Sequence, residues 1–164
     1  ARKDLGWAMA ACRVARGVTF LSRVADRSGL WGPPGAPTVS WGNWERFVAY
    51  STRLNWYLPD ALQQLAAALA TAGELMFGVA LIAGIYTRVA AYGAASLLTC
   101  FALAMATGLG IRSPLDYSVF VDAAGSWLLA AAISYESPVA TWRHQGTTKR
   151  NSQDLLPQAR ELRE

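Results

Sequence analysis

The chain has 164 residues, of which 53% are hydrophobic and only 16% are charged, and its formal net charge is +4. The charges are uneven: 8 lie among the last 22 residues and 18 among the first 142, or about 13%. Soluble domains carry roughly 25% charged residues. Composition excludes a disordered chain, a collagen-like repeat and a disulfide scaffold, and it leaves a soluble helical core or a polytopic membrane protein.

The first two of four long apolar stretches contain few charges. A membrane-spanning helix needs roughly 20 apolar residues. The first stretch, at about 5–24, is interrupted by Arg13 and Arg16, and charges inside the apolar run are not typical of a cleaved signal peptide. The second stretch, at about 61–86, is broken only by Glu74. Both are long enough for a membrane span.

The third and fourth stretches complete the set. The third, at about 89–111, contains no charge, and the fourth, at about 117–135, carries Asp122 in its outer part. No stretch alternates apolar and polar residues as the strands of a membrane barrel do. We therefore predict an all-α polytopic membrane protein whose four-helix bundle lies within residues 1–136. A polar cytoplasmic tail follows at 137–164.

The long connection at 25–60 is rich in aromatic residues, with four of the seven Trp. Within it, 40–54 resembles the start and body of a short helix. One side of this helix carries Trp44, Phe47, Val48 and Leu54. Such a pattern is typical of a helix at the membrane surface. Two roles remain open: a lid over the bundle, or an aromatic entrance for a quinone or lipid.

Four ionisable residues fall within the predicted spans: Arg13, Arg16, Glu74 and Asp122. Charges at membrane depth are costly and are therefore functional candidates. The helical rise places Arg16 and Glu74 at similar depths, which allows an ion pair between them. The nearest basic candidates for Asp122 are Arg23 and Arg112. Two roles remain open for the four charges: staples that fix helix register, or a polar pocket that binds a quinone or relays a proton.

The chain lacks most residues on which catalysis depends. Cys12 and Cys100 form no C-x-x-C pair and lie in different predicted helices, so we expect two buried free thiols. The single histidine, His144, follows the last predicted helix, so we expect no metal site and no intrinsic cofactor. We identify no catalytic residue and expect no catalysis by the chain alone. The mixed charges of the tail do not indicate nucleic acid binding.

Several motifs resemble the DoxX/DoxD family of small membrane proteins. They are Arg13-x-x-x-Gly17-x-x-Phe20, the loop 25–37 with Trp41-Gly42, the stretch from Gly73-Glu74-Leu75 to Thr87-Arg88, and Ser113–Phe120. The resemblance covers about residues 10–135. It implies four membrane helices, and the family's motif positions map onto Arg13, Glu74, Arg88 and Asp116.

The same resemblance implies a function and a location. Some family members are small subunits of a thiosulfate:quinone oxidoreductase, and others associate with redox enzymes at the membrane. We therefore expect a multi-pass subunit of a quinone-linked redox complex in a bacterial or archaeal cytoplasmic membrane. It would anchor a partner subunit and contribute to a quinone pocket.

The sequence also predicts an orientation in the membrane and leaves two alternative functions open. Lys and Arg favour both termini on the cytoplasmic side, by eight residues to five. The alternatives are a non-catalytic accessory subunit of a larger respiratory or photosynthetic complex, and a small transporter or lipid-binding module.

Overall fold

The computed structural model describes residues 2–136, which are 79% helical and contain no strand. The elements are α1 (Arg2–Arg27), α2 (Trp44–Leu54), α3 (Asp60–Ala83), α4 (Thr87–Leu109), α5 (Arg112–Asp116) and α6 (Val119–Glu136). The all-α prediction is confirmed for this part of the chain, and the predicted tail at 137–164 lies outside it. A first compact unit runs to Ala130, and the last residues of α6 belong to a second unit.

Within residues 2–136, two helices, α3 and α4, are long and apolar enough to cross a membrane. Only 28% of the most apolar segment of α3 and 39% of that of α4 is buried against the rest of the protein. A core helix of a soluble protein would be mostly buried, so these outward apolar side chains favour membrane insertion. The other two long helices do not meet the same criteria, because α1 contains several charges and the apolar part of α6 is shorter.

Helices α1 and α3 cross at two glycines. A Cβ atom on Gly17 would lie 2.8 Å from the carbonyl oxygen of Gly78 and 2.5 Å from the side chain of Ile82. The two backbones therefore touch, as small residues allow in helix packing. Elsewhere in the core, alanine makes up half of the buried apolar residues found among the described positions, and four of these alanines lie in the first half of α4.

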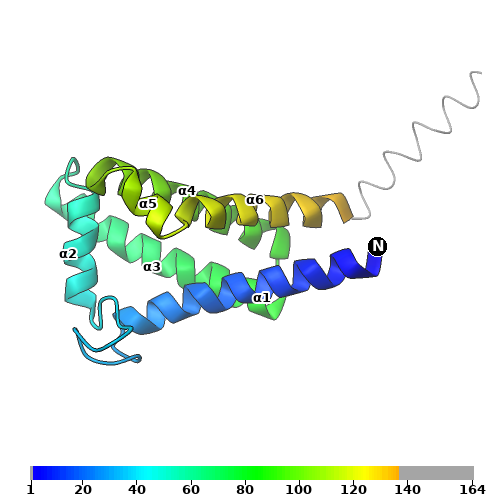
Figure 1. Ribbon diagram of the computed structural model, residues 1–164, viewed down its shortest axis with the longest axis horizontal. Coiled ribbons are helices and arrows are strands. Elements are labelled where there is room, and N and C mark those ends of the chain that lie inside the picture. The colour runs from blue at the N-terminus through cyan, green and yellow to red at the C-terminus, as the bar shows by residue number, and fades with distance from the viewer. Residues whose placement is uncertain (1, 137–164) are drawn as a thin grey trace, which may run out of the picture. The chain divides into compact units, whose positions relative to one another are not determined.

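The connection between α3 and α4 is short, as expected. Gly84 ends α3 in the left-handed conformation, with φ of +76°, and α4 begins at Thr87. Glycine adopts this conformation without steric cost. The two helices pack against each other in consequence (Figure 1). The connection between α4 and α6 contains the short helix α5.

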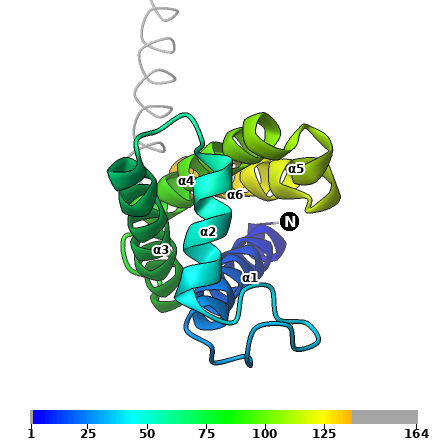
Figure 2. The same ribbon diagram turned by 90° about the vertical axis from the view of Figure 1, so that its left-hand side faces the viewer.

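Helix α2 stands across the ends of α1, α3 and α4, as Figures 1 and 2 show. It begins after Asn43, whose side chain accepts a hydrogen bond from the backbone nitrogen of Arg46 at 2.9 Å. At its other end, a Cβ atom on Gly108 would lie 2.8 Å from the Cα atom of Leu54. The prediction of a short helix here is confirmed, and its contact with α4 is as close as the backbone allows.

The buried face of α2 differs from the predicted one. Phe47, Ser51 and Leu54 are buried, whereas Trp44 is 42% exposed and Val48 is only partly buried. The spacing of the buried residues is i, i+4 and i+7, which is a single helical stripe. Hydrophobicity alone placed Trp44 on the apolar side of the helix, but the buried stripe instead includes the small polar residue Ser51.

Candidate functional site

A buried ion pair joins the end of α1 to the middle of α3. The Arg27 Nη1 atom lies 2.6 Å from Oε2 of Glu74, and these side chains are 3% and 0% exposed. The same Nη1 atom donates a hydrogen bond to the Thr71 hydroxyl oxygen at 2.7 Å, and Thr71 donates to the Ala67 carbonyl oxygen. Because a charge buried this deeply needs its partner, the pair constrains how α1 meets α3.

Aromatic rings cover the guanidinium of Arg27. Its central carbon lies 3.7 Å from the ring centre of Phe47 and 5.1 Å from that of Trp41. Cation–π contacts of this kind are favourable by about 0.5–2 kcal/mol, more when water is excluded. Arg27 therefore connects three segments: α1, α3, and α2 with the loop before it.

The neighbouring acid, Asp26, folds that loop onto the end of α1. Its carboxylate accepts hydrogen bonds from the backbone nitrogens of Ser40, at 3.2 Å, and Trp41, at 2.9 Å. The indole nitrogen of Trp31 donates to the carbonyl oxygen of Ser22 at 3.0 Å. These bonds hold the aromatic loop in place over the bundle end.

A cavity of about 730 Å³ lies beneath α2. Ligand pockets commonly have volumes of roughly 300–1,000 Å³, with apolar walls and a few polar groups. The aromatic residues of its wall are Trp31, Trp41, Phe47, Tyr50, Phe101 and Tyr117. Small and aliphatic residues of α3 and α4, such as Ala70 and Leu97, complete the apolar part. The charged residues of the wall are Arg23, Asp26 and Arg27.

Two polar groups of this wall are suited to hydrogen bonding with a ligand. Arg23 is partly exposed and forms no ion pair with an acidic side chain in the described part of the chain. Burial raises the pKa of the Tyr50 phenol above its ordinary value of 10.0, so Tyr50 keeps its proton at neutral pH. The cavity therefore offers a guanidinium and a neutral hydroxyl beside aromatic rings.

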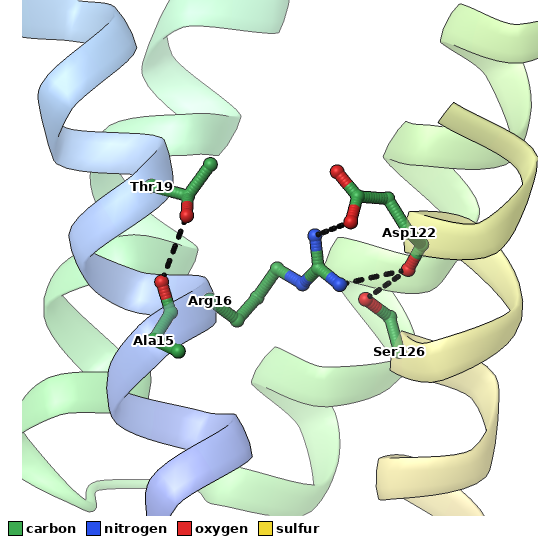
Figure 3. Close-up of polar contacts among 5 residues, drawn as sticks. All are labelled: Ala15, Arg16, Thr19, Asp122 and Ser126. Atoms are coloured by element: carbon green, nitrogen blue, oxygen red, sulfur yellow. Dashed lines mark hydrogen bonds and ion pairs between the residues drawn. The ribbon is translucent and has the colours of Figure 1, made fainter. Parts of the chain in front are cut away.

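A second ion pair joins α1 to α6 (Figure 3). The Arg16 Nη1 atom lies 3.1 Å from Oδ1 of Asp122, and its Nη2 atom donates to the backbone carbonyl oxygen of Asp122 at 3.0 Å. That carbonyl also accepts from the Ser126 hydroxyl at 2.9 Å. Arg16 is 10% exposed and Asp122 is 32% exposed. This pair joins α1 to α6 without lining the cavity beneath α2.

The other candidate arginine, Arg13 of α1, reaches the end of α3 with its side chain. A Cβ atom on Gly84 would come within 2.7 Å of Nη1 of Arg13, so the guanidinium packs against the helix terminus. A cation is favourable there, because the helix dipole gives this end a partial negative charge. Arg13 therefore has a structural partner that depth counting did not reveal.

The predicted Arg16–Glu74 ion pair is wrong, and so are the predicted partners of Asp122. Arg16 pairs with Asp122, and Glu74 pairs with Arg27. Depth along a helix does not determine the direction in which a side chain points, and α1 continues three residues beyond the predicted end at 24. Arg27 was therefore placed in the loop, although it follows the span without a break.

The four candidate residues do not gather in one pocket. Arg13, Arg16, Glu74 and Asp122 are all absent from the wall of the cavity beneath α2. Glu74 affects the wall only indirectly, because it forms an ion pair with Arg27, which lines the cavity. Sequence reasoning missed Arg23 and Arg27 as site residues, although their position beside an aromatic loop was a usable signal.

The remaining predictions concern the two cysteines and the absence of a metal site. Cys12 is partly buried, but Cys100 is exposed, so the prediction of two buried thiols is wrong for Cys100. Among residues 2–136, no group of three or more His, Cys, Asp or Glu side chains could hold a metal ion. His144 lies outside that range.

A comparison of the chain with protein-family models, curated proteins and solved structures finds no match.

Proposed function

We propose that this chain is a DoxX-like integral membrane protein in which α1, α3, α4 and α6 all span the bilayer. The outward apolar side chains of α3 and α4 support this proposal. The residues that carry the resemblance also support it, because Gly17 and Gly78 form the α1–α3 crossing and Arg13 packs at the end of α3. In this arrangement α2 lies at the membrane surface.

We further propose that the cavity beneath α2 binds the headgroup of a membrane quinone. The observation that supports this proposal is the composition of the cavity wall, which combines aromatic side chains with the guanidinium of Arg23 and the hydroxyl of Tyr50. Flat rings stack on aromatic side chains, and a guanidinium or a hydroxyl can donate hydrogen bonds to the two carbonyl oxygens of a quinone. The chain then acts as a subunit of a quinone-linked redox complex, and its partner subunit supplies the electrons.

Thermal unfolding of the full chain in mild detergent tests the quinone site. Decylubiquinone should raise the Tm of the wild type in a concentration-dependent way, because a ligand of the folded state stabilises it. Arg23→Gln should weaken binding by about tenfold or more, since a hydrogen bond to a charged group contributes about 1.5–3 kcal/mol.

Arg112→Gln is the matched control, because Arg112 is exposed and outside the cavity wall. Its response to decylubiquinone should equal that of the wild type. An equal response in the Arg23 variant, or no shift in any protein, would overturn the proposed quinone site. A shift produced by phospholipid but not by quinone would favour the lipid-binding alternative.

Purification from the native membrane tests the subunit role. Mild-detergent extraction should yield the chain together with a partner that carries a flavin, haem or iron–sulfur centre. A stable lone chain would contradict every subunit role. A redox complex that keeps its activity without this chain would favour a non-catalytic accessory subunit.

A further inference from the structure

A second cavity, of about 560 Å³, opens beside the main one. Its wall consists of Asn55, Trp56 and Tyr57, which follow α2, and of Cys100, Leu103, Ala104 and Thr107 on α4. We call it the side slot. The α4 residues are spaced i, i+3, i+4 and i+7, so they form one stripe along the helix. The slot therefore runs along one face of α4, next to the end of α2.

The side slot and the cavity beneath α2 share part of their walls. Asn55, Cys100 and Ala104 line both of them. The outer part of the slot is open, since Leu103 is 56% exposed and Trp56 is 68% exposed. The slot therefore begins at residues that also line the cavity, and it ends at the outer surface of α4.

The two walls differ in charge. The cavity contains Arg23, Asp26 and Arg27, whereas the seven residues of the slot are all uncharged. A polar headgroup is favoured beside the charges, and a hydrocarbon chain is favoured along the uncharged stripe. Because α4 is one of the two helices apolar enough to cross a membrane, the slot opens on a surface suited to lipid.

From this arrangement we infer that the side slot is a lateral entrance, which holds the hydrocarbon tail of the ligand while its head lies beneath α2. The inference rests on the proposed quinone site and adds a route and an orientation to it. The ligand enters from the bilayer between the end of α2 and α4. Headgroup affinity then depends on the cavity, and the contribution of the tail depends on the slot.

The native cysteines provide a direct test. They are the two cysteines of the chain, and Cys100 lies where cavity and slot meet, whereas Cys12 lines neither. In the Cys12→Ala variant, in lipid nanodiscs, N-ethylmaleimide should label Cys100. Decylubiquinone, used at about ten times its dissociation constant, should slow this labelling by about tenfold. Tail-less duroquinone should slow it much less at equal occupancy.

The Cys100→Ala variant is the matched control, because it leaves Cys12 as the labelled thiol. Decylubiquinone should not change the labelling rate of Cys12, so general effects of quinone in the bilayer are separated from binding. Equal protection of both cysteines would overturn the inference. Equal protection of Cys100 by the two quinones at equal occupancy would also overturn it.

A slot-filling variant provides a second test. Thr107 lines the slot and not the main cavity, so Thr107→Trp should weaken decylubiquinone binding by about tenfold while duroquinone affinity is unchanged. Val89→Trp, at an exposed position at the other end of α4, is the control and should bind both as the wild type does. If both quinones bind and Thr107→Trp weakens the binding of neither, the lateral entrance is contradicted, whereas the proposed quinone site is not. If neither quinone binds the wild type, the proposed function itself fails.

Discussion

The crossing of α1 and α3 and the end of the bundle beneath α2 are built from different kinds of residue. At the crossing, Gly17 and Gly78 bring two backbones into contact and leave no room for a methyl group. Beneath α2, large aromatic rings surround a cavity of about 730 Å³ and a buried ion pair between Arg27 and Glu74. Small residues thus give close helix contact, whereas bulky rings hold helices apart and leave space for a ligand.

The largest effect on stability is expected from the ion pair beneath α2. Glu74→Gln should lower the free energy of unfolding by about 3–5 kcal/mol, because it leaves the buried charge of Arg27 without a partner. Thermal and SDS-induced unfolding in mild detergent measure the change. Asp116→Asn is the matched control, since its pair with Arg112 is exposed, and it should unfold like the wild type. Equal effects of the two substitutions would contradict the structural role of Glu74.

The crossing itself is tested by adding one methyl group. Gly17→Ala should destabilise the protein by about 1–3 kcal/mol, because the new Cβ atom would overlap the Gly78 carbonyl oxygen and Ile82. In the same helix, Gly6 has no atom within 4 Å of an added Cβ. Gly6→Ala should therefore leave stability unchanged or raise it by up to about 1 kcal/mol. A crossing that tolerates Gly17→Ala as well as Gly6→Ala is not as tight as described.

Filling the cavity should separate binding from stability. Ala70 lines the cavity and is partly buried, so Ala70→Phe should reduce quinone affinity by about tenfold or more while the protein stays folded. The quinone-induced shift of Tm provides the measurement. Ala72→Phe, at an exposed position of the same helix, should bind as the wild type does. Normal affinity in the Ala70 variant would place the ligand outside this cavity.

The smallest effect is expected at the Arg16–Asp122 pair. A double-mutant cycle with Arg16→Gln and Asp122→Asn should give a coupling energy of about 0.5–1 kcal/mol, because Asp122 is partly exposed. Quinone affinity should be unchanged in both single variants, since neither residue lines the cavity. Loss of quinone binding in either variant would instead indicate that Arg16 and Asp122 form part of a ligand pocket.

The helices were predictable from the sequence because long apolar runs bounded by Gly, Pro and charged residues leave few alternatives. The predicted spans agree with α1, α3, α4 and α6 to within three residues at each end. The short helix α2 was also predicted, from the polar start at Ser40–Asn43 and the apolar spacing after it. Its buried stripe was wrong in part, because burial depends on which neighbours α2 meets.

The site was less predictable for a physical reason. Helical rise gives the depth of Arg16 and Glu74, but the partner of each charge depends on helix rotation and on where α1 ends. The cavity depends on the position of α2 and on the Asp26 bonds that fold the loop, which involve residues 14 and 15 positions apart. The density of aromatic residues at 31–57 was the one signal in the sequence that pointed to this end of the bundle.

Photo-crosslinking tests the central claim most directly. A quinone analogue with a photoreactive group on its ring is bound to the full chain in nanodiscs, and mass spectrometry then identifies the labelled residues. Labelling should concentrate in the 22–31 and 41–54 segments, beside Arg23 and the aromatic wall, and should disappear with excess decylubiquinone. Labelling near Arg16 and Asp122, or spread evenly over the outer surfaces of the helices, would contradict a quinone site beneath α2.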